Sequence, residues 1–453
     1  MYGVIIEKGL SDWQIIQQNN GIGKIKLSGV VIAEDDVLKQ NAKVVVRVLD
    51  EINNTRILPP VFCEIQNNKW CAEFEIPTGG PYKIETFLLF GGFKEKRGDR
   101  RFHIGVGDNY VIAGQSNAVG VGKDMISEEE VPNVHVFRLN GRWTMAAHPL
   151  HDTTDTAYPD FAEQVAVGYS PWLNFAKTLS RNLGYPIGLI PAAKGGIPLS
   201  FWDRKDDGRF FNHMLNIIKD SQSKVRGIVW YQGCNDTYDS RLRTTYFERF
   251  KSVCEDFRKE LGNLPIITVQ LNKSTCTKGK DLNAERKNFS ILREVQRKAA
   301  KEIKNLYLVP SIDLPVCDGI HNSCMSSLVL GQRAANIALK YIYGRSVICD
   351  YPDISKAFKS DKNEITLYFD NVFTSIFSDY NPTEFLPFSA KDEKGRILPE
   401  DYECVENKIV LRFKRNLGRK ITVSCDGPCE SGLIPYDLYS YLPIIMFDEV
   451  EVK

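Results

Sequence analysis

The stretch "VIAGQSNAVG" at residues 111–120 joins a short apolar run to a polar triplet. The apolar run predicts a buried strand, and Gly114 permits a tight turn directly after it. The turn would expose the hydroxyl of Ser116 between the amides of Gln115 and Asn117. The same residue types also favour a plain capping turn at the start of a helix. The rest of the chain has to decide between a cap and an exposed nucleophile.

Strand-like and helix-like segments alternate around this stretch, through residues 105–345. Apolar runs predict strands at 109–114, 186–193, 227–233, 264–272 and 305–312. Longer amphipathic segments predict helices at 170–184, 245–262, 289–303 and 326–344. Strand followed by helix, repeated, indicates an α/β fold with a parallel sheet that is covered on both faces. In such folds, ligands bind outside the carboxyl ends of the strands.

The two flanks have a different pattern. Residues 24–104 contain short, β-branched, alternating runs at spacings of roughly ten residues, which is typical of a β-sandwich. Alternation returns after residue 346 and predicts a smaller β-rich domain. We therefore expect three domains: an immunoglobulin-like or jelly-roll-like sandwich at 1–104, a catalytic α/β domain at 105–345 and a β-domain at 346–453.

The composition excludes several functional classes. The 453 residues carry a formal net charge of +1, so no overall field favours nucleic acid or an anionic membrane. The N-terminus lacks the pattern of a signal peptide, and no window of about 18 apolar residues occurs. We expect a soluble cytoplasmic protein whose oligomeric state is open, a homo-oligomer included.

The cysteines are spread along the chain. The eleven residues include no CxxC pair and no Cys/His spacing suited to zinc, so we expect reduced thiols and no metal. Cys425 and Cys429 are close in sequence, which is weak support for either a bridge or a metal site.

Polar residues and glycines collect at four of the predicted strand ends. They are "GQSN" at 114–117, "AAKGG" at 192–196, "YQGCND" at 231–236 and "DGIH" at 318–321. Acyl transfer needs a hydroxyl nucleophile, a base, a carboxylate that orients the base, and donors for the oxyanion. These strand ends supply Ser116, His321 and Asp318 for the first three parts.

Donors for the oxyanion can come from three of the same strand ends. We expect the backbone N–H of Ser116, a backbone N–H from Gly195 or Gly196, and the side-chain amide of Asn235. A set of this kind requires no cofactor. Asp236 can either orient the backbone here or serve as a turn residue.

The order of these blocks resembles the SGNH hydrolases. "GQSN", "GGIPLSFW", "WYQG" and "DGIHNS" are similar to the branch that contains sialate O-acetylesterases and other carbohydrate acetylesterases. Weaker likeness lies in "WTMAAHPLHD", "IPTGGPYKIE" and "YDLYSYLPIIMF". The resemblance implies a flavodoxin-like, three-layer α/β/α central domain and a serine esterase that forms an acetyl-enzyme on Ser116.

The chain also departs from that family pattern. Cys234 stands where relatives commonly carry an acidic residue, Ile197 replaces a small residue, and "SPW" at 170–172 replaces a glycine-rich "GPG". These changes are expected to alter the shape of the pocket and to leave the catalytic groups intact. The reaction type is therefore better defined than the substrate.

Several functions remain open at this level. The flanking likeness favours O-acetylated sialic acid, whereas "PLHD" at 149–152 is similar to esterases that act on acetylated xylan or other plant oligosaccharides. Acyl transfer to another acceptor and cleavage of lipid esters are further possibilities. A non-catalytic glycan-binding protein is the alternative from another class.

Five further side chains are candidates for lining the substrate pocket: Gln115, Gln232, Trp202, His151 and Cys234. Trp202 could stack on a sugar ring or fill the core. His151 and Asp152 could form a second polar pair at the pocket rim. Cys234 could act as an alternative nucleophile, although a buried thiol without an activating neighbour is the simpler interpretation.

Overall fold

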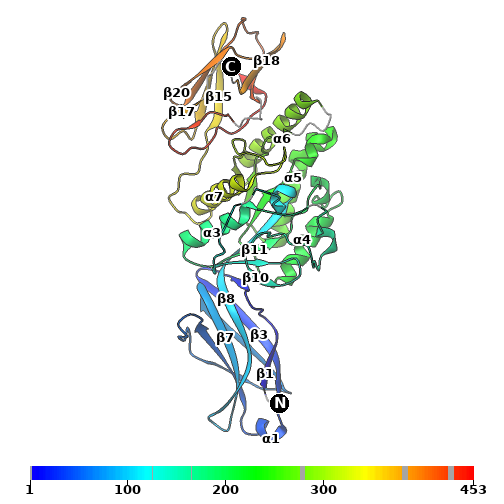
Figure 1. Ribbon diagram of the computed structural model, residues 1–453, viewed down its shortest axis with the longest axis vertical. Coiled ribbons are helices and arrows are strands. Elements are labelled where there is room, and N and C mark those ends of the chain that lie inside the picture. Colours follow the sequence, from blue (N-terminus) through cyan, green and yellow to red (C-terminus); the bar gives the residue numbers. More distant parts are fainter. Residues whose placement is uncertain (1–2, 125, 165, 276–280, 380–385, 427–432) are drawn as a thin grey trace.

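The molecule is elongated, with strands at both ends and a mixed α/β part in the middle (Figure 1). A computed structural model describes residues 3–453 except 125, 165, 276–280, 380–385 and 427–432. Buried apolar side chains form three clusters, one in each of these parts. The largest cluster lies in the middle part and surrounds its sheet.

The middle sheet has the strand order β10-β9-β11-β8-β12-β13-β14. The strands are β8 (Lys94–Gly114), β9 (Val134–Phe137), β10 (Trp143–Met145), β11 (Ile187–Pro191), β12 (Gly227–Tyr231), β13 (Ile266–Val269) and β14 (Leu306–Val309). All neighbours are parallel except β10, which pairs with β9 in the antiparallel sense. The five predicted strands are confirmed, whereas β9 and β10 were too short to stand out in the sequence.

Helices lie on both sides of this sheet. They are α2 (Ser116–Val119), α3 (Pro171–Leu183), α4 (Arg209–Asp220), α5 (Ser240–Leu261), α6 (Leu282–Glu302) and α7 (Cys324–Tyr341), with short 3₁₀ turns η1 (Pro159–Phe161), η2 (Leu199–Phe201) and η3 (Asn235–Tyr238). In Figure 1, α3 and α7 lie to the left of the strands, and α4 and α5 lie to the right. Every residue of β11 and β12 is buried, as expected when both faces of a sheet are covered.

The N-terminal part is built mostly from antiparallel strands around the long strand β8. One sheet contains β1 (Gly3–Lys8), β3 (Ile22–Ile32) and β6 (Lys69–Pro77). The other elements are β2 (Ile15–Gln17), α1 (Asp35–Leu38), β4 (Lys43–Asp50), β5 (Val61–Glu64) and β7 (Gly79–Phe90). Strand β8 pairs with β7 in its first half and with β11 and β12 in its second half. It therefore runs without interruption from the N-terminal part into the middle sheet, past residues 104 and 105.

The C-terminal part is an eight-stranded sheet with a small two-stranded ribbon. The sheet contains β15 (Asp353–Asp361), β16 (Glu364–Asp370), β18 (Phe388–Asp392), β19 (Gly395–Ile397), β20 (Asp401–Val405), β21 (Lys408–Arg412), β22 (Ile421–Cys425) and β24 (Val450–Val452). The ribbon pairs β17 (Ile376–Phe377) with β23 (Tyr436–Asp437). The alternating pattern of the sequence thus corresponds mostly to antiparallel pairs, although β15 and β24 pair in the parallel sense.

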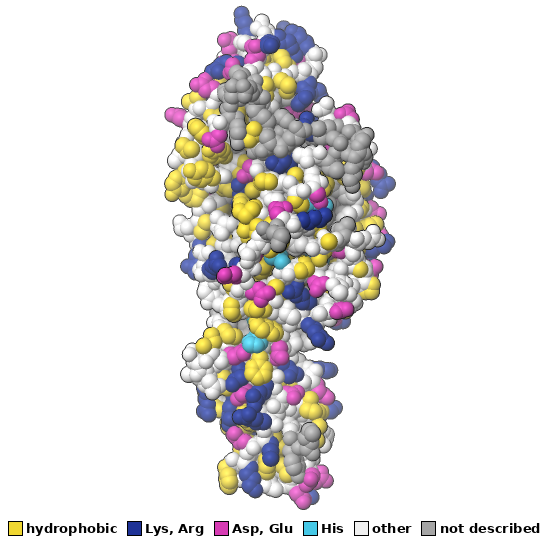
Figure 2. Space-filling view, in the orientation of Figure 1, with side chains coloured by type: hydrophobic (Ala, Val, Ile, Leu, Met, Phe, Trp, Pro, Cys, Tyr) yellow, Lys and Arg dark blue, Asp and Glu magenta, His cyan; other side chains and the backbone are white. Residues whose placement is uncertain are grey.

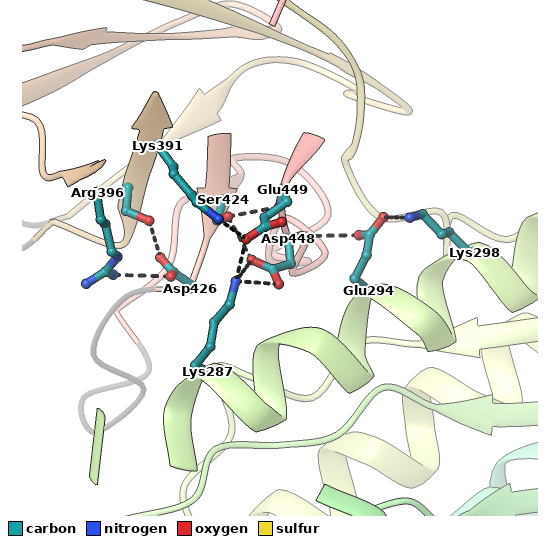
Figure 3. Close-up of polar contacts among 10 residues, drawn as sticks. Lys287, Glu294, Lys298, Lys391, Arg396, Ser424, Asp426, Asp448 and Glu449 are labelled. Carbon is teal, nitrogen blue, oxygen red and sulfur yellow. Dashed lines mark hydrogen bonds and ion pairs between the residues drawn. The ribbon is translucent and has the colours of Figure 1, made fainter. Parts of the chain in front are cut away.

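The C-terminal part contacts the carboxyl end of the middle sheet. Gln270, directly after β13, exchanges two hydrogen bonds with the backbone of Met446, at 2.9 and 3.1 Å. Lys287 of α6 lies 2.8 Å from Asp448 and 3.2 Å from Glu449 in a network of polar contacts (Figure 3). The C-terminal part therefore adjoins the sheet edge at which the sequence predicts the chemistry.

Two other expectations meet the structure here. No helix in the described part of the chain is both long and apolar enough to span a bilayer. Apart from Cys425, the described cysteines carry free thiols. A pairing of Cys425 with Cys429 cannot be followed, because Cys429 lies outside the described residues.

Candidate active site

Strand β8 ends in a sharp turn that presents Ser116. Gly114 has a φ of +127°, and a Cβ atom at this position would lie 2.3 Å from the carbonyl oxygen of Tyr231. Only glycine fits both the conformation and the space. The N–H of Gln115 donates to that carbonyl at 2.9 Å, and α2 begins at the next residue. The turn thereby lifts the Ser116 side chain out of the strand.

The structure brings Ser116, His321 and Asp318 together from opposite ends of the middle part. Nε2 of His321 lies 2.8 Å from Oγ of Ser116, and Nδ1 lies 2.8 Å from Oδ2 of Asp318. The carboxylate also accepts the backbone N–H of His321 at 3.0 Å. A proton on Nδ1 that bonds to the carboxylate leaves Nε2 free to accept the hydroxyl proton of Ser116.

The Asp318 carboxylate is suited to orienting this imidazole. Burial raises its pKa, but hydrogen bonds from the ring and backbone of His321 outweigh that effect, and the net pKa lies below its usual value. Asp318 is therefore ionised at neutral pH. An ionised partner fixes the ring orientation and stabilises the imidazolium that forms when His321 takes a proton.

The two amides beside Ser116 connect its turn to neighbouring strand ends. Oε1 of Gln115 accepts the N–H of Gly233 at 2.9 Å. On the other side, Nδ2 of Asn117 donates to the carbonyl of Ile320 at 3.1 Å, and its Oδ1 accepts the N–H of Asn322 at 3.0 Å. Gln115 is buried against backbone, so its prediction as a pocket-lining residue is wrong. Both amides hold the blocks in place.

The Gly195-Gly196 turn offers one N–H for an oxyanion. The N–H of Gly195 donates to Oε1 of Glu163 at 2.7 Å. The N–H of Gly196, whose φ is +73°, has no acceptor among the described residues. Nδ2 of Asn235 donates to the carbonyl of Gly196 at 2.9 Å, which places the amide beside this turn. Since Nδ2 carries two hydrogens, one remains for a ligand.

Glu163 is a residue that sequence reasoning missed. Its carboxylate is almost fully buried and lies 3.5 Å from the ammonium group of Lys194. It belongs to the segment between β10 and α3, which showed no periodicity and no recognisable motif. Nothing in the local sequence connects Glu163 to a turn that follows 32 residues later.

A buried carboxylate connects the second and third blocks. Both oxygens of Asp236 accept the N–H of Leu199 at 3.1 Å, and Nε2 of Gln232 donates to Asp236 at 2.5 Å and to the carbonyl of Ile197 at 3.3 Å. Burial raises the pKa of Asp236 to about 6. Gln232 is fully buried, so its prediction as a pocket-lining residue is wrong. Together the two side chains fix the loop that carries the glycine pair.

Two other predicted pocket residues belong to the protein interior. Trp202 is fully buried and packs edge-on against Trp230, with ring centroids 5.1 Å apart, so it fills the core and cannot stack on a sugar. Cys234 is buried as well, and burial raises its pKa to about 12. Its thiol is neutral at physiological pH, which makes it unsuited to be a nucleophile, and its burial argues against a contact with substrate.

The predicted polar pair of His151 and Asp152 does not form. His151 is fully buried, with Nε2 2.7 Å from the carbonyl oxygen of Ala193, and burial lowers its pKa to about 4. Asp152 accepts the backbone N–H and the hydroxyl of Thr154 at 3.0 and 2.7 Å. The two neighbours serve separate local structures, so the prediction of His151 as a pocket residue is wrong.

A serine, a histidine and an aspartate in mutual contact beside a parallel sheet are the arrangement expected of a carboxylic ester hydrolase. Comparison with known sequences gives the family. Residues 106–340 match the family described as carbohydrate esterase, sialic acid-specific acetylesterase, and the chain belongs to this family. It is a carbohydrate acetylesterase.

Two relatives illustrate how far the likeness extends. A probable carbohydrate esterase of Arabidopsis thaliana is 25% identical over 241 residues, which cover 44% of this chain and 89% of the relative. The crystal structure of a carbohydrate acetylesterase from Xanthomonas citri superimposes with a TM-score of 0.65, covering 98% of this chain and 99% of that one. At 19% identity this second likeness shows the fold alone.

Proposed function

We propose that the chain is a serine O-acetylesterase that removes O-acetyl groups from sialic acid through an acetyl-enzyme on Ser116. The observation that carries the reaction is the continuous contact from Asp318 through both ring nitrogens of His321 to Oγ of Ser116, each contact being 2.8 Å. The sialic acid substrate is supported by the family description alone.

In the proposed first half-reaction, Nε2 of His321 accepts the hydroxyl proton of Ser116 while Oγ attacks the ester carbonyl. The N–H groups of Ser116 and Gly196 and the amide of Asn235 stabilise the oxyanion. The C–O bond to the sugar then breaks, and the departing sugar oxygen takes the proton from His321. The acetyl group remains on Ser116.

In the second half-reaction, His321 removes a proton from water, and the resulting hydroxide attacks the acetyl carbonyl. The same donors stabilise the second oxyanion, and acetate leaves as Ser116 recovers its proton from His321. The residues named here need no metal or organic cofactor to complete this cycle.

We also propose that the middle part is the three-layer α/β/α catalytic domain at 105–345, with a β-sandwich at 1–104 and a β-domain at 346–453 on either side. The three separate clusters of buried apolar residues support this division. The uninterrupted strand β8 implies that the first boundary is a rigid connection and not a flexible linker.

Release of nitrophenol from 4-nitrophenyl acetate tests the serine mechanism. The wild type should hydrolyse the ester, Ser116→Ala should lose the activity, and Cys234→Ala should retain it. Full activity in Ser116→Ala would refute the role of Ser116. Rates on O-acetylated N-acetylneuraminic acid and on acetylated xylo-oligosaccharides then test the substrate, and faster hydrolysis of the second would overturn the sialic acid proposal.

A further inference from the structure

An exposed aromatic patch lies on the C-terminal part, around the ribbon of β17 and β23. We define it as Phe373, Phe377, Tyr436, Tyr439 and Tyr441. Tyr436 packs edge-on against Phe377 and stacks against Tyr441, with ring centroids 6.0 and 5.8 Å apart. Tyr439 and Tyr441 are nevertheless 63% and 67% exposed. Hydrophobic side chains gather at the left edge of Figure 2, between the heights of β17 and α7 in Figure 1.

A buried carboxylate holds this patch in a fixed shape. Asp437, which is fully buried, accepts the N–H of Phe373 at 2.9 Å, of Thr374 at 3.1 Å and of Ser440 at 2.8 Å. Phe373 and Thr374 belong to the segment that leads into β17, and Ser440 lies between Tyr439 and Tyr441. Since one carboxylate holds the backbone of both segments, less backbone freedom is lost when a ligand binds to the rings that they carry.

A cavity of about 390 Å³ adjoins the patch. It lies between the turn at residues 440–442 and helix α7, and its lining combines apolar and hydrogen-bonding side chains: Leu328, Val329, Gln332, Asn336, Ser440 and Tyr441. The guanidinium of Arg333, which also lines it, is held by the carboxylate of Asp313 at 2.6 and 2.8 Å. Aromatic faces beside amides and hydroxyls suit a neutral, hydroxylated ligand.

Helix α7 connects this cavity to the candidate active site. The helix begins at Cys324, three residues after His321. Met325, Val329 and Gln332 lie on one exposed stripe of the helix, since they are separated by four and three residues. Gln332 is about 12 Å along the helix axis from Cys324. This span exceeds what a single sugar bound at Ser116 could reach.

We propose that the aromatic patch and its cavity bind the neutral sugar units of an oligosaccharide whose acetylated unit lies at Ser116. The inference rests on the proposed function, because it assumes hydrolysis at that residue. The chain is a carbohydrate acetylesterase, so its ligands are sugars. Pyranose rings have apolar faces that stack on aromatic rings and hydroxyl groups that bond to amides. The enzyme would therefore prefer oligosaccharides to free monosaccharides.

Steady-state kinetics on substrates of different length test the proposal. The variants are Tyr439→Ala, the double variant Tyr439→Ala/Tyr441→Ala, and the control Phe93→Ala, whose ring is 82% exposed on the N-terminal part. The substrates are acetylated sialyllactose, acetylated xylohexaose, acetylated N-acetylneuraminic acid and 4-nitrophenyl acetate. For at least one oligosaccharide, KM should rise fivefold or more in the double variant and less in the single variant. Rates on the two small substrates and all rates of the control should stay within twofold of the wild type.

An unchanged KM for both oligosaccharides in a double variant that melts like the wild type would overturn the proposal. So would sedimentation showing that the double variant only dissociates a dimer, since the patch would then be a contact between two copies. Failure of the proposed function is distinguishable: it is seen as full activity in Ser116→Ala, whereas the length dependence compares variants that keep Ser116.

Discussion

Two histidines lie close to aspartates in the sequence, but only one of them contacts its aspartate in the structure. His321 bonds to Asp318 through Nδ1 and to Ser116 through Nε2, and part of its side chain is accessible to solvent. His151 is fully buried, makes one contact to the carbonyl of Ala193, and leaves its neighbour Asp152 to bond elsewhere. Residue types alone do not make a catalytic pair.

The difference lies in spacing and in position on the sheet. Asp318 and His321 are three residues apart on a turn, where one carboxylate can accept both the ring and the backbone N–H of the histidine. His151 and Asp152 are consecutive, and their side chains point to different partners. His321 of the first pair also contacts Ser116, which follows the end of β8. His151 instead contacts the carbonyl of Ala193, two residues before the glycine turn.

The largest expected contrast comes from matched substitutions of the two aspartates. Asp318→Asn should lower kcat for 4-nitrophenyl acetate by about 10⁴-fold, because an amide no longer selects the imidazole tautomer that can accept a proton from Ser116. Asp152→Asn should stay within twofold of the wild type, since Asp152 contacts Thr154 and not a catalytic group. Equal losses in both variants would remove the distinction between the two pairs.

Much of the middle fold could be predicted from the sequence, because its signals are local. Apolar runs of six to nine residues located five strands, and amphipathic segments located four helices. Strands β9 and β10 were not predicted, since segments of four and three residues are too short to show a periodic pattern. The sequence also showed no sign that β8 continues from the N-terminal strands into the middle sheet, because burial changes along this strand while its extended conformation does not.

Site residues could be predicted where they follow a strand end. They could not be predicted where burial determines whether a side chain lies in the core or lines a pocket. Ser116, Asp318 and His321 follow parallel strands, whose carboxyl ends lie along the same edge of a sheet. Their proximity could therefore be anticipated. Trp202 and His151 have side chains that serve equally well in a core or at a pocket, and only tertiary packing distinguishes the two. Glu163 depends on the path of an irregular segment, which no local pattern encodes.

The next largest loss of kcat is expected from Asn235, one of the proposed donors to the oxyanion. Asn235→Ala should reduce kcat by about 10² to 10³-fold, since it removes one donor to the oxyanion and leaves the nucleophile and base in place. KM should change little. As a control, Asn336→Ala removes an amide from α7 that lies outside the site, and it should hydrolyse 4-nitrophenyl acetate at the normal rate. A loss of less than threefold in Asn235→Ala would exclude this amide from the oxyanion site.

A smaller effect is expected from Glu163, whose carboxylate accepts the N–H of Gly195 in the glycine turn. His151 contacts the same loop at the carbonyl of Ala193. Glu163→Ala should lower kcat about tenfold, because the N–H of Gly195 loses a charge-assisted hydrogen bond and the glycine turn becomes less ordered. Glu163→Gln retains an acceptor oxygen and should recover most of the rate. If the alanine variant were faster than the wild type, the carboxylate would be an obstacle to the oxyanion and not a support for its donor.

The smallest expected effect is a contribution of the buried His151 to the pH dependence of the free energy of unfolding. Burial lowers the pKa of His151 to about 4 in the folded protein, whereas an unfolded chain protonates histidine near pH 6.5. As the pH falls through this window, the unfolded state binds a proton that the folded state excludes, so the free energy of unfolding decreases. Between pH 6.5 and 5.5 the loss in the free energy of unfolding due to His151 should be about 1 kcal/mol.

Urea denaturation of the wild type at both pH values should show this loss. The variant His151→Gln, whose side chain cannot be protonated, should lack the part that is due to His151. An identical pH dependence in the two proteins would mean that His151 is accessible to protons when folded, and its contrast with His321 would then rest on geometry alone.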